Sequence, residues 1–296
     1  MDFQVELNKK IKLVDEALDQ LMPTVDANPV TIHKAMRYSI FAGGKRLRPV
    51  LVMAAAEALG VDGRQLLPVA CAMELIHTYS LIHDDLPSMD NDDYRRGKLT
   101  NHKIYGEGVA ILAGDGLLTL AFQLMAQKTE SGYTNEKAIL RAITEVAVAA
   151  CTLGMIGGQV ADIEAENKVI DGEALRSIHA RKTGALYRAS LRSGAILAGA
   201  TEGQLGALTK YAEALGLAFQ ITDDVLDIEG DESKLGKKVG SDIKNNKATY
   251  PALYGLETSK QMAAQAVEEA LGALAIFGPE ADLLREIVKY IIKREI

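Results

Sequence analysis

Cysteine is scarce in this chain. Its 296 residues include two cysteines, Cys71 and Cys151, which lie in apolar stretches and lack the paired spacing of a metal site. This excludes a disulfide framework and a cysteine-ligated metal centre. We expect both side chains to be buried, reduced thiols, as in a protein of the reducing cytosol.

An excess of basic residues is also missing. The chain has 33 Lys and Arg against 40 Asp and Glu, a formal net charge of −7. This balance disfavours general affinity for nucleic acid, so we expect no nucleic-acid partner. Local clusters of basic residues can still bind anionic ligands.

Export signals and long hydrophobic runs are not evident. The first residues show no succession of basic, apolar and small residues, so no signal peptide is indicated. The longest uncharged apolar stretch, residues 146–161, is interrupted by glycines and Gln159 and is shorter than the ~20 residues that a membrane span needs. We therefore expect a buried helix there, no membrane span, and a cytoplasmic protein.

Strand-like alternation is not sustained anywhere, whereas apolar residues recur at helical spacing. Leu7, Ile11, Val14 and Leu18 lie on one face of a helix that should end before Pro23. Similar patterns fill residues of about 30–60, 66–83, 107–128, 136–166, 173–200, 204–229, 248–273 and 280–294. No long linker or fixed repeat divides them, and 48% apolar residues supply a full core. We predict one all-α domain over residues 1–296.

Several of these helices are apolar nearly all round, which makes their polar residues informative. In residues 211–230, YAEALGLAFQITDDVLDIEG, the side chains of Gln220, Asp223 and Asp227 share one helix face. Carboxylates left without partners in a dry interior would be strongly destabilising. We therefore expect cations, metal ions or water in an interior pocket beside this face.

A second acidic cluster occupies residues 80–102, SLIHDDLPSMDNDDYRRGKLTNH, with five aspartates and two adjacent arginines. Asp84 and Asp90 would lie about 240° apart round an ideal helix, so they can face one site only if Pro87 lets the chain turn back. Two such clusters favour a hard divalent cation held by oxygen. Because each has few carboxylates and no calcium-loop spacing, the ion would share its ligands with water and a substrate phosphate, as Mg²⁺ does.

Basic residues lie close to both acidic clusters. The residue types that bind anions are Lys45, Arg46, Arg48, Arg95, Arg96, Lys182 and Lys237. A diphosphate bridged through Mg²⁺ to carboxylates at one end, and held by Lys and Arg at the other, requires both signs of charge close together.

Five motifs together resemble the short-chain trans-prenyl diphosphate synthases over nearly the whole chain. They are GGKRLRP, LIHDDLPSMDNDDYRRGK, GGQVADIEAE, KTGALYRAS and FQITDDVLDIEGDESKLGKKVGSD. The resemblance implies a homodimer of all-α subunits, each an isoprenoid-synthase-type helical bundle around a deep central cavity. One aspartate motif would lie on each facing wall, with three Mg²⁺ ions between them. Tyr94 and Leu99 depart from the residues common in similar sequences, at the flanks of the first motif.

The resemblance also implies roles for individual residues. The metal ligands would be Asp84, Asp90 and Asp223, supported through hydrogen bonds by Asp85, Asp224 and Asp227. The allylic diphosphate would be held by Arg95, Lys182 and Lys237. Isopentenyl diphosphate would be held by Lys45, Arg48, His77 and Arg96, with Lys247 a further candidate in that region. Thr183, Gln220 and the carbonyl groups near Lys182 would face the reacting carbons.

The implied reaction is the head-to-tail condensation of isopentenyl diphosphate with dimethylallyl and geranyl diphosphate, by ionisation of the allylic substrate. Tyr79 would form the floor that stops the product near fifteen carbons, whereas the small Ser80 leaves room beyond ten. Ideal geometry places Tyr79 about 140° from Asp84, so this role rests on the resemblance. Farnesyl diphosphate is the expected product, with a geranylgeranyl or geranyl diphosphate synthase as the alternative.

Other functions use similar residues. A metal-dependent diphosphate hydrolase or a terpene cyclase would not need the second, metal-free anion site. A non-catalytic subunit of a prenyltransferase could keep the fold but could dispense with one aspartate motif, and both are present here. We expect His83 to be packed or hydrogen-bonded, not catalytic, and we leave Gln159 and Asp162 outside the site although they share a helix face.

Overall fold

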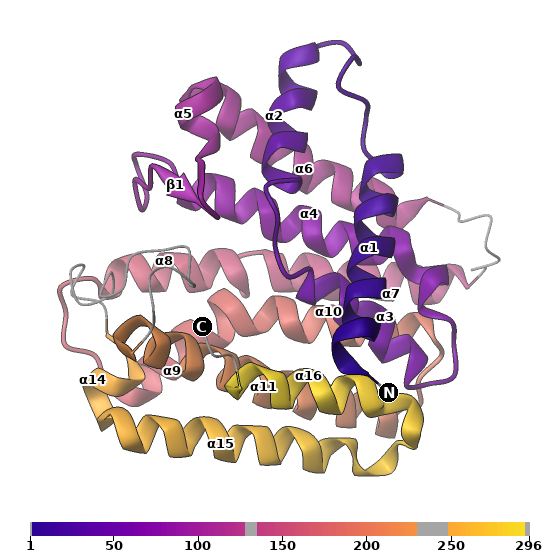
Figure 1. Cartoon of the computed structure of the whole chain (residues 1–296), viewed down its shortest axis with the longest axis vertical. Helices are drawn as coiled ribbons and strands as arrows, with labels where there is room; N and C mark the ends of the chain where they lie inside the picture. The colour runs from indigo at the N-terminus through magenta and orange to yellow at the C-terminus, as the bar shows by residue number, and fades with distance from the viewer. Residues whose placement is uncertain (1, 128–134, 230–247, 294–296) are drawn as a thin grey trace.

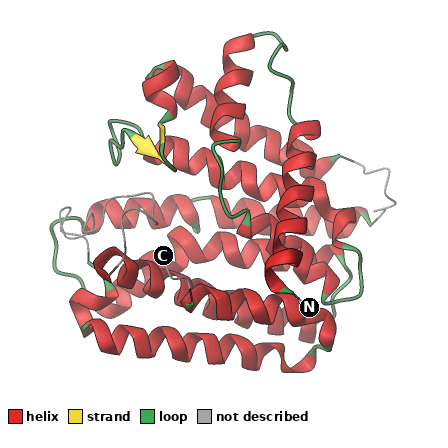
Figure 2. Ribbon diagram, viewed as in Figure 1, coloured by secondary structure: helices red, strands yellow, loops and turns green. Residues whose placement is uncertain are grey.

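The computed structural model describes residues 2–127, 135–229 and 248–293. Figure 2 shows that helices make up almost all of this part, which confirms the predicted all-α fold. Strands in the described residues are limited to one antiparallel hairpin, β1 (Tyr94–Arg95) and β2 (Lys98–Leu99). Figure 1 shows α2, α4, α5 and α6 stacked above α8, α10, α11 and α15.

The N-terminal half supplies the upper group of helices together with α3, which lies lower in Figure 1 and packs against α10. They are α1 (Phe3–Leu21), α2 (Val30–Ile40), α3 (Leu47–Glu57), α4 (Leu67–Asp84), α5 (Asn101–Tyr105) and α6 (Glu107–Ala126), with a 3₁₀ turn at Gly63–Leu66. α1 ends before Pro23 as predicted, and Asp2 caps its start by accepting a hydrogen bond from the Val5 N–H at 3.2 Å. The pattern at residues 30–60 is two helices, because Gly43, Gly44 and Arg46 adopt positive φ between them.

The C-terminal half supplies the lower group. Its helices are α7 (Glu136–Ala150), α8 (Met155–Ala165), α9 (Gly172–His179), α10 (Ala185–Leu197), α11 (Glu202–Glu229), α14 (Tyr250–Tyr254), α15 (Leu256–Ala273) and α16 (Asp282–Ile292). A π-helical turn, η2 (Ala180–Gly184), joins α9 to α10, and 3₁₀ turns lie at Leu274–Ile276 and Pro279–Ala281. α11 packs on α10 and α15, with Tyr211 and Leu215 fully buried in their shared core.

The expectation for residues 146–161 is wrong. α7 ends at Ala150 and α8 begins at Met155, so the stretch is two helices around a sharp turn. Gly154 allows this turn because a Cβ there would lie 2.1 Å from the Ala149 carbonyl oxygen. Leu153 is 80% exposed, and Cys151 is exposed, contrary to the prediction that both thiols are buried. Cys71 is buried as expected.

Three segments are long and apolar enough to cross a membrane by length and composition: Gly63–Asp84, Glu107–Ala126 and Glu136–Ala165. These criteria use length and composition alone, so the absence of a membrane span stays a prediction. The first is mainly a core helix, since 67% of its apolar window is buried. The other two are only 39% and 33% buried, so each keeps an apolar side outside the core of one chain.

Candidate active site

The first aspartate motif begins where α4 ends. α4 stops at Asp84, and the Asp90 N–H donates a hydrogen bond to the Asp84 carbonyl oxygen at 2.8 Å. The chain therefore turns back after Pro87, as the spacing of the two aspartates required. Burial raises the pKa of the Asp84 carboxyl to about 6; Lys182 opposes this shift, and Asp90 adds to it.

Asp85 points to an arginine of the hairpin. The Arg95 Nε donates to the Asp85 Oδ1 at 2.6 Å, and a second Arg95 nitrogen lies 2.5 Å from the same oxygen. Burial raises the pKa of the 3% exposed Asp85, and the Arg95 contact counteracts that shift. Arg95 also approaches Asp92 at 3.5 Å. Both signs of charge in residues 80–102 thus meet in contact, so the motif is not a solvated loop.

The GGKRLRP motif forms the turn between α2 and α3, and Arg46 does not contribute to an anion site. Its guanidinium is buried against Asp15 and Glu74, each at 2.8 Å, and donates to the Ile40 carbonyl oxygen at 2.7 Å. The interpretation of Arg46 as an anion-binding residue is therefore wrong. Its left-handed backbone, φ 47°, turns it inward, which the sequence pattern did not indicate.

Arg96 and Arg48 lie around the same turn. The Arg96 guanidinium donates to the Gly43 carbonyl oxygen, and it occupies the space where a Cβ on Gly44 would lie, 2.6 Å from its Nη1. The Arg48 guanidinium lies over the ring of Tyr187, 4.6 Å from its centroid. A side chain at Gly44 would therefore compete with the Arg96 guanidinium for this space.

His77, on α4, faces these arginines. Burial is the main cause that lowers the pKa of His77 well below its ordinary value, and Arg48, Arg96, Arg95 and Arg46 lower it further. The imidazole is therefore neutral near pH 7. The structure thus places His77 in the same positive field as Arg48 and Arg96, the residues that the sequence grouped with it.

The π-helical turn η2 contains Lys182, the residue that opposes the raised pKa of Asp84. Within it, the Lys182 Nζ lies 2.6 Å from the Asp162 Oδ2 of α8. Gly158 lets α8 approach this closely, because a Cβ there would be 2.2 Å from the Lys182 backbone nitrogen. The sequence analysis left Asp162 outside the site. The only signal for it was the face that it shares with Gln159 on a glycine-rich helix.

Side chains of η2 and α11 and a backbone N–H of α14 form a chain of hydrogen bonds beside Lys182. The Thr183 hydroxyl donates to the Gln220 Oε1 at 3.2 Å, and the Gln220 Nε2 donates to the Asp224 Oδ1 at 3.0 Å. The Tyr250 backbone N–H donates to the Asp224 Oδ2 at 3.0 Å. Asp223 is half-buried next to this chain, and Asp227 is buried on the same helix. The polar face predicted for α11 therefore lies inside the bundle.

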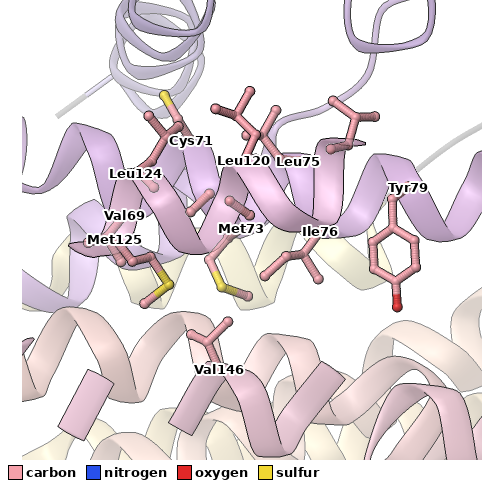
Figure 3. Close-up of a cluster of buried hydrophobic side chains, with 14 of the residues drawn as sticks. Val69, Cys71, Met73, Leu75, Ile76, Tyr79, Leu120, Leu124, Met125 and Val146 are labelled. Atoms are coloured by element: carbon pink, nitrogen blue, oxygen red, sulfur yellow. The ribbon is translucent and has the colours of Figure 1, made fainter. Parts of the chain in front are cut away.

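The two candidate chain-length residues lie one turn before the first motif. Figure 3 shows Tyr79, Ile76 and Met73 pointing from α4 to the side from which Val146 approaches. Tyr79 is 5% exposed, and its ring lies edge-on to His83 with centroids 5.7 Å apart. The Ser80 hydroxyl bonds back to the His77 carbonyl at 2.9 Å.

His83 has a packing role, as expected. Its Nε2 lies 3.0 Å from the Ile111 carbonyl oxygen, and Gly114 of α6 leaves room for the imidazole. Lys237 and Lys247, the remaining predicted anion-binding residues, lie outside the described residues.

One groove lies apart from these candidate site residues. It has a volume of about 700 Å³ and lies between α9, η2, α10, α11 and α15, with Arg176, Arg188 and Lys210 on its rim. None of the predicted site residues lines it. We therefore assign the candidate active site from the polar contacts of the two aspartate motifs and not from this hollow.

Comparisons with known proteins identify the family of the chain. Residues 29–291 match the polyprenyl synthetase family. A farnesyl diphosphate synthase of Geobacillus stearothermophilus is 52% identical over 264 residues, 89% of this chain and 88% of that protein. A geranylgeranyl diphosphate synthase of Cyanophora paradoxa is 47% identical over 289 residues, 97% and 95% of the two chains. The crystal structure of a geranylgeranyl pyrophosphate synthetase of Pyrococcus horikoshii superposes with a TM-score of 0.90 at 33% identity, covering 99% of each chain. This chain belongs to the polyprenyl synthetase family.

Proposed function

We propose that the protein condenses isopentenyl diphosphate with dimethylallyl diphosphate and then with geranyl diphosphate, and releases farnesyl diphosphate. The observation that carries the proposal is that cations lie both beside the acidic residues and at the GGKRLRP turn. Lys182 pairs with Asp162 and Arg95 with Asp85, whereas Arg96 donates to the Gly43 carbonyl oxygen of the turn that also precedes Arg48. Two anion sites of different character suit two diphosphate substrates, one bound through metal and one without it.

The acidic residues suit Mg²⁺. Asp84, Asp90 and Asp223 would supply only carboxylate oxygens. A bound cation would offset the cost of burying the charged Asp84 carboxylate. No three His, Cys, Asp or Glu side chains in the described part of the chain are close enough to hold a metal alone. We therefore propose three Mg²⁺ ions that share their coordination with substrate phosphate and water. Bound Mg²⁺ supplies Lewis-acid stabilisation of the charge that grows on the departing diphosphate.

The chain's own residues bind and orient the allylic substrate. Lys182, held by Asp162, and Arg95, held by Asp85, place positive charge where the diphosphate leaves. We propose that Lys237 completes this group. As the allylic fragment becomes positively charged, Thr183, Gln220 and the carbonyl groups near Lys182 face its carbons and stabilise that charge.

Isopentenyl diphosphate takes the second anion site. Arg48 and Arg96 bind its phosphate oxygens, and the neutral His77 offers a hydrogen bond without adding charge. Lys45 and Lys247 are proposed to belong to the same site. The double bond then attacks the allylic cation, and the departed diphosphate, not a side chain, accepts the proton. Apolar helix surfaces exclude water, which would otherwise capture the cation.

Tyr79 sets the proposed product length. It lies on α4 five residues before Asp84, and its ring points to the same side of the helix as Ile76 and Met73 (Figure 3). A bulky floor at this depth favours a fifteen-carbon product, and Ser80 leaves room for more than ten. The Cyanophora relative carries the name of a geranylgeranyl diphosphate synthase, so a twenty-carbon product is the second candidate.

A homodimer is the proposed assembly. Exposed apolar side chains gather on α6, α7, α8 and the turn between the last two: Ile111, Leu112, Leu140, Val148, Leu153, Ile156, Val160 and Ile163. A surface of this kind on a soluble enzyme is typical of contact with another protein chain. A second copy covering it would also account for the low burial of these helices without a membrane span. We propose a cytoplasmic location.

The test is a condensation assay. The purified protein is incubated with Mg²⁺, labelled isopentenyl diphosphate and dimethylallyl diphosphate, and the dephosphorylated products are separated by chain length. A fifteen-carbon alcohol supports the whole proposal, and a twenty-carbon alcohol supports the reaction but contradicts the role of Tyr79. If the folded protein shows no Mg²⁺-dependent condensation, the non-catalytic subunit replaces the enzyme as the better interpretation.

A further inference from the structure

We propose that Asp224 is a positioning residue that fastens the start of α14 to the π-helical turn η2, through Gln220 and Thr183. This inference rests on the proposed function and assigns the second aspartate of the α11 motif a task different from that of Asp223. It predicts that Asp224 acts through its hydrogen bonds, and that a different residue pair with the same bonds can replace it.

The two oxygens of Asp224 accept hydrogen bonds from different parts of the chain. Oδ1 accepts from the Gln220 amide at 3.0 Å, and Oδ2 accepts from the Tyr250 backbone N–H at 3.0 Å. The carboxylate is 3% exposed, so both bonds are screened from water. Asp224 therefore joins its own helix to the beginning of α14.

Gln220 extends this connection to the π-helical turn η2. The side-chain carbonyl of Gln220 accepts from the Thr183 hydroxyl at 3.2 Å, so its amide is oriented by a partner on each side. Thr183 follows Lys182 within η2, and a π-helical turn is a rare, strained insertion in a helix that often marks a functional position. The direction of Lys182 and Thr183 thus depends on where Gln220 is held.

α14 also contacts the residue that directly precedes η2. The ring of Tyr250 lies against that of His179, the last residue of α9, with centroids 5.6 Å apart. Thr249 caps α14 by accepting from the Ala252 N–H at 3.3 Å. If Asp224 releases the Tyr250 N–H, α14 can move away from η2, and the support of Lys182 and Thr183 changes.

A charge swap tests this inference. Asp224→Asn leaves an amide group facing one of two N–H donors, and Gln220→Glu places two carboxylates side by side. The double variant Gln220→Glu/Asp224→Asn keeps all three bonds. In it, the new amide at position 224 donates to the new carboxylate at position 220 and accepts from the Tyr250 N–H, while the Thr183 hydroxyl donates to the same carboxylate. The net charge of the pair is also unchanged, so the double variant is the matched control for each single one.

The first readout uses protein without metal or substrate. We expect hydrogen exchange at the Tyr250 amide to be at least about tenfold faster in Asp224→Asn than in the wild type, and to return towards the wild-type rate in the double variant. Unchanged exchange in Asp224→Asn overturns the proposal. If Asp224→Asn alone does not fold and the double variant does, the hydrogen-bonded connection is supported by that rescue.

The second readout is kinetic. We expect Asp224→Asn to lower kcat about 10²-fold with little change in the KM for isopentenyl diphosphate, because misplaced groups reduce turnover more than remote binding. Because Gln220 itself is proposed to face the reacting carbons, the double variant is compared with Gln220→Glu alone, and we expect its kcat to be higher than that of this single variant. If exchange at Tyr250 is restored in the double variant but its kcat is about 10²-fold below that of Gln220→Glu, Asp224 acts as a carboxylate at the metal, and the proposal is wrong. A wild-type protein without condensation activity would refute the proposed function, and the exchange experiment would still decide the role of Asp224.

Discussion

At the scale of single residues, the buried position of Asp84 disfavours the charged form of its carboxyl. Burial raises the pKa of its carboxyl to about 6, from an ordinary value of 3.8. The folded state therefore binds this proton more tightly than the unfolded state does. The free energy of unfolding falls as the pH rises through this window, by up to about 3 kcal/mol from Asp84, and the loss is complete above pH 6 to 7.

Asp84→Asn should separate stability from activity. Without metal at pH 8, we expect the variant to unfold several degrees above the wild type, because the amide has no buried charge to desolvate. At pH 5 the gap should shrink, since Asp84 is then mostly protonated. Turnover with Mg²⁺ should fall by orders of magnitude. Thermal unfolding in chelator at both pH values checks this, with Asp26→Asn on the exposed surface as control. The prediction is contradicted if pH changes the difference in unfolding temperature from the wild type equally in both variants.

Tyr79 offers a second single-residue test, because its ring and its hydroxyl have separable effects. The ring is buried beside His83, whereas the hydroxyl has no hydrogen-bond partner among the described residues. Tyr79→Ala should shift the products from fifteen to twenty or more carbons. Tyr79→Phe keeps the ring, so its products should be unchanged and its stability equal or slightly higher. Chromatography of the dephosphorylated products decides, and identical profiles for the two variants would remove Tyr79 as the floor.

At the scale of elements, the contact between α8 and η2 positions Lys182. A Cβ at Gly158 would lie 2.2 Å from the Lys182 backbone nitrogen, whereas a Cβ at Gly206 of α11 meets nothing within 4 Å. Both glycines are helical, so the same substitution compares a tight contact with open space.

We expect Gly158→Ala to displace η2, with a loss of stability of about 1–3 kcal/mol from overpacking and a fall in kcat of about 10²-fold. Gly206→Ala should instead stabilise the protein by about 0.5–1 kcal/mol, because alanine favours a helix over glycine, and should leave turnover unchanged. Denaturant unfolding and steady-state kinetics measure both. Normal kcat in a folded Gly158→Ala variant would show that the turn tolerates the shift.

The elements that the sequence predicted well are those decided by local pattern. The end of α1 before Pro23 and the turn after Asp84 follow from proline chemistry and apolar spacing. The π-turn, the inward rotation of Arg46 and the break between α7 and α8 do not, because each depends on a contact distant in sequence or on backbone strain. Arg46 illustrates this, since its partners Asp15 and Glu74 lie on two other helices and no spacing rule brings them to it.

The same limit applies to the site. The acidic residues and their cations could be read from two motifs, because charge of both signs in apolar surroundings requires partners. Asp162 was missed because nothing in its own helix points to Lys182, 20 residues later in the chain. The prediction that Cys151 is buried was wrong because apolar residues around it lie at the surface of the chain and not in its core.

At the scale of the whole molecule, this apolar surface is the main feature that a single chain leaves unexplained. Leu112, Leu153 and Val160 are 60%, 80% and 50% exposed, and they lie on α6, on the turn before α8 and on α8. The apolar windows of Glu107–Ala126 and Glu136–Ala165 are only 39% and 33% buried. A single chain would therefore leave a large area of apolar surface in water. A second copy of the chain can cover it, since one patch that pairs with itself closes a two-fold dimer.

Charge placed on this surface should therefore dissociate the proposed dimer. We expect Leu153→Asp combined with Val160→Asp to shift the mass measured by light scattering after size exclusion from two chains to one, with helical content retained. Ile276→Asp is the matched control, because Ile276 is 63% exposed in the 3₁₀ turn that follows α15 and is not part of α6–α8, and its variant should remain a dimer. If the wild type is a monomer that floats with lipid vesicles, and the double variant does not, a membrane and not a second copy covers this surface. If the double variant stays dimeric, the interface lies elsewhere on the chain.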